Sequence, residues 1–220
     1  MNTVSTQQGE LFGALPVLAG GLEYRPEFIS PDEEAQLLEE IAKLPLEHAA
    51  YKDYSARRRT TSFGSEYDFG ENVLESAPAV PPFLLPLRDR FAEWIAISPE
   101  RFAQALVSEY LPGTPLGWHR DVPQFEVIVG LSLGTPCRMR FRPYEADRAD
   151  AGPGESFSLD LQPRSAYVMR EASRWDWQHA IAPTPGLRHS ITFRTLRRGW
   201  RRGGVKEAAK DPAQDPSTKP

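Results

Sequence analysis

The sequence lacks the features that would place a protein outside the cytosol. It has a single cysteine, Cys137, which excludes an intrachain disulfide and suits a reducing compartment. No apolar run approaches the roughly 20 residues of a membrane span. The longest early apolar stretch, Leu11–Leu22, is interrupted by glycine and proline and follows no basic residue, unlike a secretory signal. We therefore expect a cytoplasmic protein without a membrane segment.

An excess of positive charge is also missing, because 26 lysines and arginines face 30 aspartates and glutamates, a formal net charge of −4. This balance argues against a protein that coats nucleic acid non-specifically, although clustered arginines leave a local basic surface open. The 220 residues suffice for one sizeable core. We predict a single domain over residues 1–202. Residues 203–220 are predicted to form a disordered tail, because they have almost nothing to bury.

Two helices are predicted ahead of residue 100. The segment Ser30–Glu33 supplies an N-cap serine, a proline at the first helical position and a glutamate that completes a capping box. Leucines and isoleucine follow at helical spacing until Pro45 ends the segment. A second amphipathic segment covers Leu84–Ile97. We expect both helices to pack on a sheet and to carry no chemistry.

From Phe102 onward the apolar period changes from about 3.6 residues to about 2. Short apolar runs then recur, closed by glycine, proline or aspartate. They are Ala105–Leu111, Leu116–Asp121, Phe125–Leu133, Cys137–Pro143, Phe157–Leu161, Ser165–Arg170, Trp175–Ile181 and Arg188–Arg197. About eight short strands after two helices predict a mostly β fold, a double-stranded β-helix (jelly roll), and not alternating βαβ units.

Three side chains are candidates for a metal site. His119 and Asp121 stand two residues apart in an extended segment, so both point the same way. His179 lies on a late strand, which antiparallel folding can bring to the same place. Two histidines and one carboxylate with open coordination positions form the facial triad of non-haem Fe(II) oxygenases. Zinc with the same ligands and a plain salt bridge in a loop stay as alternatives.

A late strand carries two arginines on one face. Along Arg188–Arg194 the side chains of Arg188, Ser190, Thr192 and Arg194 face one way, while the intervening His189, Ile191 and Phe193 face the other. If the first set faces the interior, its guanidinium groups need anionic partners. Guanidinium forks match carboxylates, so we predict a small dicarboxylate bound there. The alternative is an exposed edge strand.

These motifs, in this order, resemble the AlkB family of nucleic-acid dealkylases. The resemblance runs from about Val107 to Thr195. Ser108–Gly113 is similar to the family's Asn-x-Tyr-x-Pro-Gly segment, Gly130–Gly134 to its Ser-Leu-Gly strand, and Arg188–Arg194 to its Arg-x5-Arg strand. The sequence departs from the best-known members at Ser108 and Ser190, where they have asparagine. It departs again at Val122–Gln124, where an acidic residue is usual.

The resemblance implies that His119, Asp121 and His179 bind Fe(II). It implies that Arg188, with Tyr110, binds the distal carboxylate of the co-substrate 2-oxoglutarate, and that Arg194 approaches the carboxylate nearer the metal. Ser190 is a further candidate contact of the co-substrate. The implied reaction is oxidative demethylation of N-alkylated bases in DNA or RNA, as in alkylation repair. It consumes dioxygen and 2-oxoglutarate, and releases succinate and an aldehyde.

Residues 51–69 resemble the family's lid over a flipped nucleotide. Arginines beside aromatic residues combine phosphate contacts with stacking surfaces, as single-strand binders do. The candidate substrate contacts are Arg57, Arg58, Arg59, Phe63, Tyr67 and, outside the lid, Trp118. An ordinary loop with solvated arginines and core aromatics is the alternative. Arg138, Arg140 and Arg142 alternate on a further strand and form a second basic stripe.

We therefore expect a monomer that acts on single-stranded or locally opened nucleic acid. Two other functions stay open. One is the same chemistry on a protein side chain or a small molecule, which the absence of a lid would favour. The other is a non-catalytic β-sandwich binding module in which His119 and His179 never meet. A metal titration separates the last function from the other two.

Overall fold

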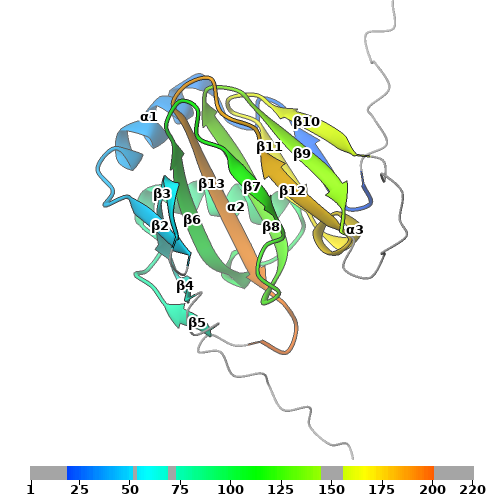
Figure 1. The fold of residues 1–220 in the computed structure, drawn as a ribbon. Coiled ribbons are helices and arrows are strands. Elements are labelled where there is room, and N and C mark those ends of the chain that lie inside the picture. The colour runs from blue at the N-terminus through cyan, green and yellow to red at the C-terminus, as the bar shows by residue number, and fades with distance from the viewer. Residues whose placement is uncertain (1–18, 52–53, 69–72, 145–155, 201–220) are drawn as a thin grey trace, which may run out of the picture.

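Two antiparallel sheets face each other in the computed structural model, which describes residues 19–51, 54–68, 73–144 and 156–200 (Figure 1). The predicted tail over 203–220 lies outside the described residues, as do residues 52–53 and 69 of the candidate lid. The strands are β1 (Leu22–Arg25), β2 (Glu47–Tyr51), β3 (Tyr54–Phe63), β4 (Ser65–Asp68), β5 (Val73–Ser76), β6 (Phe102–Tyr110), β7 (Leu116–His119), β8 (Phe125–Gly134), β9 (Cys137–Pro143), β10 (Phe157–Leu161), β11 (Ala166–Met169), β12 (Trp177–Ile181) and β13 (Arg188–Leu196). The helices are α1 (Pro31–Ile41), α2 (Leu85–Trp94) and α3 (Glu171–Trp175), with 3-10 turns η1 (Pro82–Leu84) and η2 (Pro99–Arg101).

The larger sheet has the order β1-β11-β8-β13-β6-β3-β2, and the smaller one β10-β9-β12-β7. Strands β6 to β13 alternate between the two sheets in the manner of a jelly roll, except that the consecutive strands β9 and β10 pair within the smaller sheet, and this confirms the predicted fold class. All eight predicted runs correspond to these eight strands. A separate β4–β5 hairpin lies beside the larger sheet (Figure 1).

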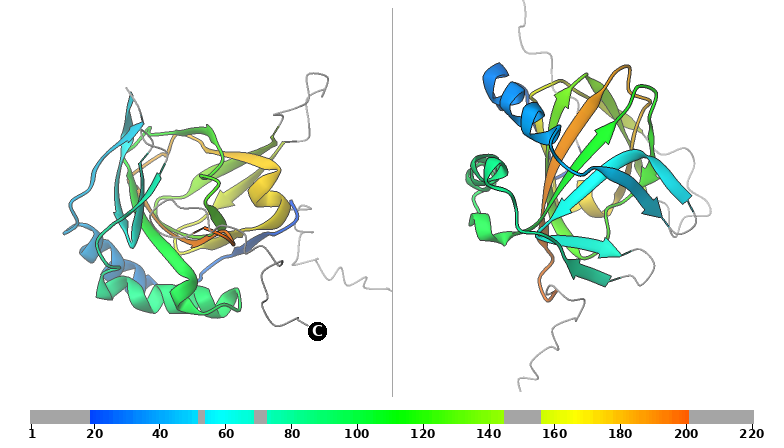
Figure 2. Two further views of the ribbon diagram at one scale, coloured as in Figure 1. Left: turned by 90° about the horizontal axis from the view of Figure 1, so that it is seen from below. Right: turned by 90° about the vertical axis from the view of Figure 1, so that its left-hand side faces the viewer.

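The helices α1 and α2 cover the outer face of the larger sheet (Figure 2). The capping box predicted for α1 is present, with Ser30 and Glu33 bonded reciprocally to each other's backbone N–H groups. Leu37 and Ile41 of α1 and Phe91 of α2 are buried against this sheet. Apolar residues from alternate positions of β6, β8 and β13 supply the other half of this core. No described helix has the length and apolar character of a membrane span.

A second core fills the space between the two sheets. It contains Phe125, Ile128, Met139 and Phe141, all buried. Side chains alternate along the strands that contribute to this core, so successive residues face this interior and the opposite side of the sheet in turn. The open end of this interior is where the candidate site lies.

Two local predictions differ from the structure. Residues 54–63, for which an ordinary loop was the alternative to a lid, form the strand β3, which pairs with β6 and extends the larger sheet. Trp175, predicted to begin a strand, instead ends the short helix α3, and β12 begins at Trp177. The pairing of β3 with β6 is a long-range contact, which local periodicity does not reveal.

Candidate active site

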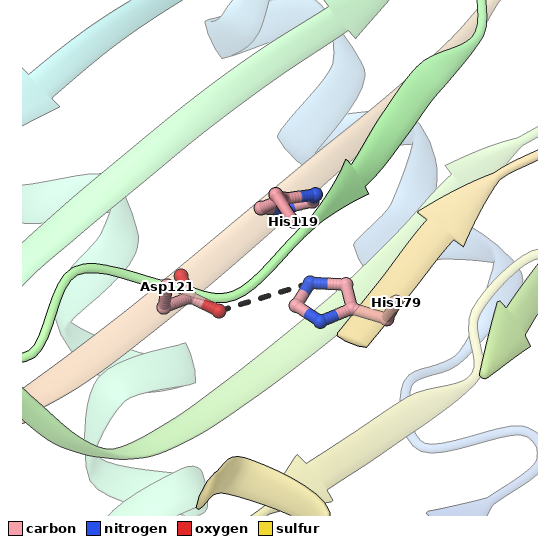
Figure 3. Close-up of side chains that lie close together, drawn as sticks. All are labelled: His119, Asp121 and His179. Carbon is pink, nitrogen blue, oxygen red and sulfur yellow. Dashed lines mark ion pairs between the residues drawn. The ribbon is translucent and has the colours of Figure 1, made fainter. Parts of the chain in front are cut away.

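The three predicted metal ligands meet at the end of the smaller sheet (Figure 3). His119 is the last residue of β7 and lies opposite His179 of β12 in the strand pairing. Asp121 follows two residues after His119 in the loop that leads to β8. The nitrogen and oxygen ligand atoms of the three side chains lie within 4.8 Å of one another, and His179 Nε2 is 3.7 Å from Asp121 Oδ2. This donor set fits the facial triad of a non-haem iron centre.

All three side chains are in the protonation state that a metal requires. Burial, helped by the charge of His119, lowers the pKa of His179 to about 3, and burial also lowers the pKa of His119. Burial would raise the pKa of Asp121, but the charges of Arg194, His179, Arg174 and His119 together outweigh it and hold this pKa below its usual range. His119 Nδ1 is 2.9 Å from the carbonyl oxygen of Gly117, which leaves Nε2 of this ring available to a metal.

Arg194 contacts the metal-ligand carboxylate itself. Its Nε donates to Asp121 Oδ1 at 3.0 Å, and its Nη1 donates to Gln104 Oε1 at 3.0 Å. The sequence predicted that Arg194 would approach a co-substrate carboxylate. The structure shows Asp121 as its partner, so Arg194 neutralises and orients a candidate metal ligand, and its contact with the co-substrate stays a prediction.

The short helix α3 holds the loop that carries Asp121. The Nη2 group of Arg174, which is 3% exposed, donates to the backbone carbonyl oxygens of Asp121, Val122 and Phe125 at 3.1, 2.7 and 2.9 Å. Its guanidinium also stacks on Trp175, with Cζ 4.3 Å from the ring centroid. No local motif marks Arg174 as a site residue, because its partners are backbone atoms some 50 residues away in the chain.

A pocket extends from the metal ligands along the inner face of β6 and β13. Its polar lining includes Tyr110, Arg188, Ser190, Thr192 and Arg194, and apolar residues such as Met139, Met169 and Ile181 close it. The strict alternation predicted for β13 therefore holds, with His189 on the opposite face. The lining also contains Ser108 and Tyr167, both buried.

Arg188 is a buried cation in the lining of this pocket. It is 2% exposed, its Nε donates to Ser132 Oγ at 3.1 Å, and its Cζ lies 4.9 Å from the ring centroid of Tyr110. Its Nη1 has no hydrogen-bond partner among the described residues. A buried cation without a partner is costly, so an anionic ligand that fills the pocket would relieve that cost.

The three consecutive arginines of β3 point in different directions. Arg58 enters the pocket, and its buried Nε has no hydrogen-bond partner in the described part of the chain. Burial raises the pKa of the Tyr110 hydroxyl, but the charges of Arg58 and Arg188 outweigh it and lower this pKa overall. Arg59 lies on the other face of the strand, 2.6 Å from Glu109, which in turn lies 3.2 Å from His189 Nε2. Arg57 is exposed.

Three aromatic residues predicted to contact substrate lie elsewhere. Phe63 is 8% exposed and belongs to the core beneath α1 and α2, so it offers no free stacking face. Tyr67, on β4, packs against the core between the sheets. Trp118 is absent from the pocket lining, and the guanidinium groups of Arg140 and Arg142 lie over its ring. Residues on opposite faces of one strand separate in this way, and sequence alone does not say which face is inside.

Comparison with known proteins gives one family and one fold. The family model described as the 2OG-Fe(II) oxygenase superfamily matches residues 21–194. A relative, the uncharacterized protein L905 of Acanthamoeba polyphaga mimivirus, is 28% identical over 159 residues, which are 71% of this chain and 70% of that protein.

Solved structures share the fold at low sequence identity. OsALKBH1 superposes with a TM-score of 0.63 at 15% identity, over 81% of this chain and 98% of that one. A Pseudomonas putida prolyl-4-hydroxylase gives a TM-score of 0.52 at 16% identity, over 81% of this chain and 94% of that one. The fold is thus shared with solved structures of two differently named proteins.

Proposed function

Because the chain belongs to the 2OG-Fe(II) oxygenase superfamily, we propose that it is a dioxygenase that removes alkyl groups from ring or exocyclic nitrogens of nucleic-acid bases. The predicted oxygenase class and its requirements, Fe(II), 2-oxoglutarate and dioxygen, are confirmed by the family match and by the His-Asp-His cluster. The class of substrate is the proposed part.

The described residues divide between the metal and the co-substrate. His119, Asp121 and His179 would hold Fe(II), with Arg194 orienting the carboxylate. Arg188 would bind the distal carboxylate of 2-oxoglutarate, because this pocket residue is 2% exposed and its Nη1 has no hydrogen-bond partner among the described residues. Tyr110 and Ser190 line the same place. With these groups bound, dioxygen oxidises 2-oxoglutarate to succinate and carbon dioxide and hydroxylates the substrate carbon.

The rest of the reaction needs little from the protein. A carbon hydroxylated next to a base nitrogen is a hemiaminal, in which loss of the hydroxyl proton and cleavage of the carbon–nitrogen bond release an aldehyde. The electron pair of the broken bond stays on the base nitrogen, which becomes neutral if the alkylated ring was cationic and takes up the proton if it was neutral. The protein's contribution at this stage is to orient the base and to keep competing solvent out of an apolar pocket.

The observation that carries the nucleic-acid proposal is the position of β3. This arginine-rich strand borders the pocket, with Arg58 inside it and Arg57 exposed on the opposite face. The motif resemblance over Val107–Thr195 points the same way. Hydroxylation of a protein side chain is the second candidate, and it is supported by the shared fold with a prolyl-4-hydroxylase.

The test is a panel of substrates offered to the iron-loaded enzyme. Single- and double-stranded DNA and RNA oligonucleotides with N-methylated bases form one arm, and proline-containing peptides form the other. We expect formaldehyde and succinate to be released in equal amounts with at least one oligonucleotide, and no release in a His179→Ala control. Succinate at the substrate-free rate with every oligonucleotide, together with hydroxylated peptide, would replace dealkylation by protein hydroxylation.

A further inference from the structure

The reverse face of the metal-binding strands carries a strip of arginine and aromatic side chains. In β7, His119 points into the pocket and the preceding Trp118 points out of it. In β9, Met139 and Phe141 are buried in the interior, so Arg138, Arg140 and Arg142 project from the outer face. The arginines of this stripe and Trp118 therefore share one exposed surface on the smaller sheet.

The side chains of this surface bridge three strands. The order β9-β12-β7 places β12 between Trp118 and the arginines. Arg140 and Arg142 reach across it, with Cζ atoms 5.0 and 4.5 Å from the Trp118 ring centroid. They cover Ala180 of β12, which is 2% exposed and pairs with Arg140.

A second arginine–aromatic pair, Arg120 with Tyr144, lies next to the candidate metal ligand His119. Arg120 follows His119 directly, and its Cζ lies 3.3 Å from the ring centroid of Tyr144, which is 39% exposed. Its Nη1 donates to the carbonyl oxygen of Trp175 at 2.9 Å. We call Trp118, Arg120, Arg140, Arg142 and Tyr144 the arginine–aromatic strip.

The cations of the strip are held by stacking and hydrogen bonds, and no carboxylate of the described residues neutralises them. Within the described ranges, Arg120, Arg140 and Arg142 form no ion pair with a carboxylate, whereas Arg138 on the same face is bound by Asp160 at 2.8 Å. Arg142 uses only its Nε, which donates to Gln178 Oε1 at 2.8 Å. A stacked guanidinium keeps its remaining N–H groups in the plane of the fork, where they can bind an oxyanion at little entropic cost.

We propose that the arginine–aromatic strip binds the phosphate backbone of the single strand whose target base enters the pocket. This inference rests on the proposed function and adds a phosphate-binding surface outside β3. Arg140 and Arg142 stand two residues apart on a strand, which spaces their Cα atoms by roughly 7 Å and suits neighbouring anionic groups of a chain. Positive charge combined with aromatic platforms is the arrangement by which proteins hold single strands. In a chain of net charge −4, a cluster of unpaired arginines marks a specific face.

The experiment compares two variants of β9. Arg140→Gln with Arg142→Gln removes the unpaired cations, and Arg138→Gln removes a cation already neutralised by Asp160. Binding of a single-stranded N-methylated oligonucleotide is followed by fluorescence anisotropy over a salt series. We expect the double variant to bind roughly tenfold more weakly, with the slope of log K against log salt reduced by about 0.7 for each lost contact. Its KM for the oligonucleotide should rise far more than its kcat falls, and Arg138→Gln should match the wild type.

A charge-preserving variant guards against an unrelated loss of structure. Arg140→Lys with Arg142→Lys should keep most of the salt slope. If the glutamine double variant keeps the wild-type affinity and the wild-type slope of log K against log salt, the arginine–aromatic strip does not bind the phosphate backbone. The dealkylase proposal would be unaffected by that result. A wild-type protein that binds acidic peptides and no oligonucleotide would overturn both.

Discussion

At the scale of single residues, the carboxylate of Asp121 is the most constrained group in the pocket. Its Oδ2 faces His179, its Oδ1 accepts from Arg194, and its backbone carbonyl accepts from Arg174. The negative charge of Asp121 is therefore available to bind a metal, and it also neutralises the charge of Arg194, whose side chain is mostly buried. Removing this charge has two separable consequences.

We expect Asp121→Asn to lose metal affinity and to keep the fold, because the amide retains the shape and one acceptor oxygen. Asp121→Ala should lose metal affinity and more stability than Asp121→Asn, since the buried Arg194 then loses its hydrogen-bond acceptor as well as its counter-charge, a loss of about 3–5 kcal/mol in comparable pairs. Calorimetric titration with Mn²⁺ and urea unfolding measure the two effects.

His119→Ala and His179→Ala should lower metal affinity beyond the roughly 10- to 100-fold typical of outer-shell changes. Any of these variants that binds the metal normally would remove that residue from the ligand set.

Arg188 gives a prediction about the co-substrate. Adding 2-oxoglutarate to the Mn²⁺-loaded protein should raise the melting temperature of the wild type and should scarcely change that of Mn²⁺-loaded Arg188→Met. The metal-loaded Arg188→Met enzyme should show a KM for 2-oxoglutarate roughly 10- to 100-fold higher, because a charged hydrogen bond is lost. Arg188→Lys should recover part of this, since an ammonium supplies charge without the fork. An unchanged KM in Arg188→Met would show that another group binds the distal carboxylate.

At the scale of elements, strand β3 carries two neighbouring arginines for which we expect different functions, because one enters the pocket and the other is exposed. Arg58→Met should raise the KM for 2-oxoglutarate, because Arg58 enters the pocket beside Tyr110. Arg57→Gln, one residue away on the exposed face, should leave that KM unchanged and weaken oligonucleotide binding alone. Initial rates with each substrate varied in turn measure both. Identical profiles for the two variants would mean that β3 moves as a unit and that its alternation has no functional meaning.

The helix α3 should control the metal through the backbone of its neighbouring loop. In Arg174→Met the carbonyl oxygens of Asp121, Val122 and Phe125 lose their shared donor. We expect metal affinity to fall by roughly 10- to 100-fold, as for other outer-shell losses, with partial recovery in Arg174→Lys. Titration with Mn²⁺ is the measurement. A large loss of thermal stability with unchanged metal affinity would limit Arg174 to a structural role.

At the scale of the whole molecule, stability should depend on pH through three buried histidines. Burial lowers the pKa of His119, His179 and His189 in the folded state, although Glu109 opposes the effect at His189. Below about pH 6.5 the unfolded chain therefore binds more protons than the folded one. The contribution of these histidines to the free energy of unfolding of the metal-free protein should be at its maximum above that pH. It should fall on acidification by up to about 1.4 kcal/mol per pH unit for each histidine.

Urea unfolding between about pH 7.5 and about pH 5.5 measures this slope. Asp121 does not interfere, because a carboxyl with a lowered pKa gives up its stabilisation only below about pH 4. His189→Gln should reduce the slope by about a third and leave metal affinity intact. A flat profile in the wild type would contradict the neutral, buried state of these rings.

The sequence by itself determined the features that depend on local periodicity. Alternation over about two residues marked the eight strands β6 to β13, and a capping box with helical spacing marked α1. The i, i+2 spacing of His119 and Asp121 placed both on one face, and the same rule grouped Arg188 with Ser190 and Arg194. These relations are fixed by backbone geometry before any tertiary contact forms.

Only the tertiary structure decided which face is inside and which distant residues are partners. It turned Arg58 into the pocket and Arg59 toward Glu109, and it placed Phe63 in the core and Trp118 on the outer surface. It also gave Arg194 to Asp121 and brought Arg174 to the metal-ligand loop. Such pairings join residues about 50 or more positions apart, where the energy of burial and long-range hydrogen bonding, and no local propensity, selects the contact.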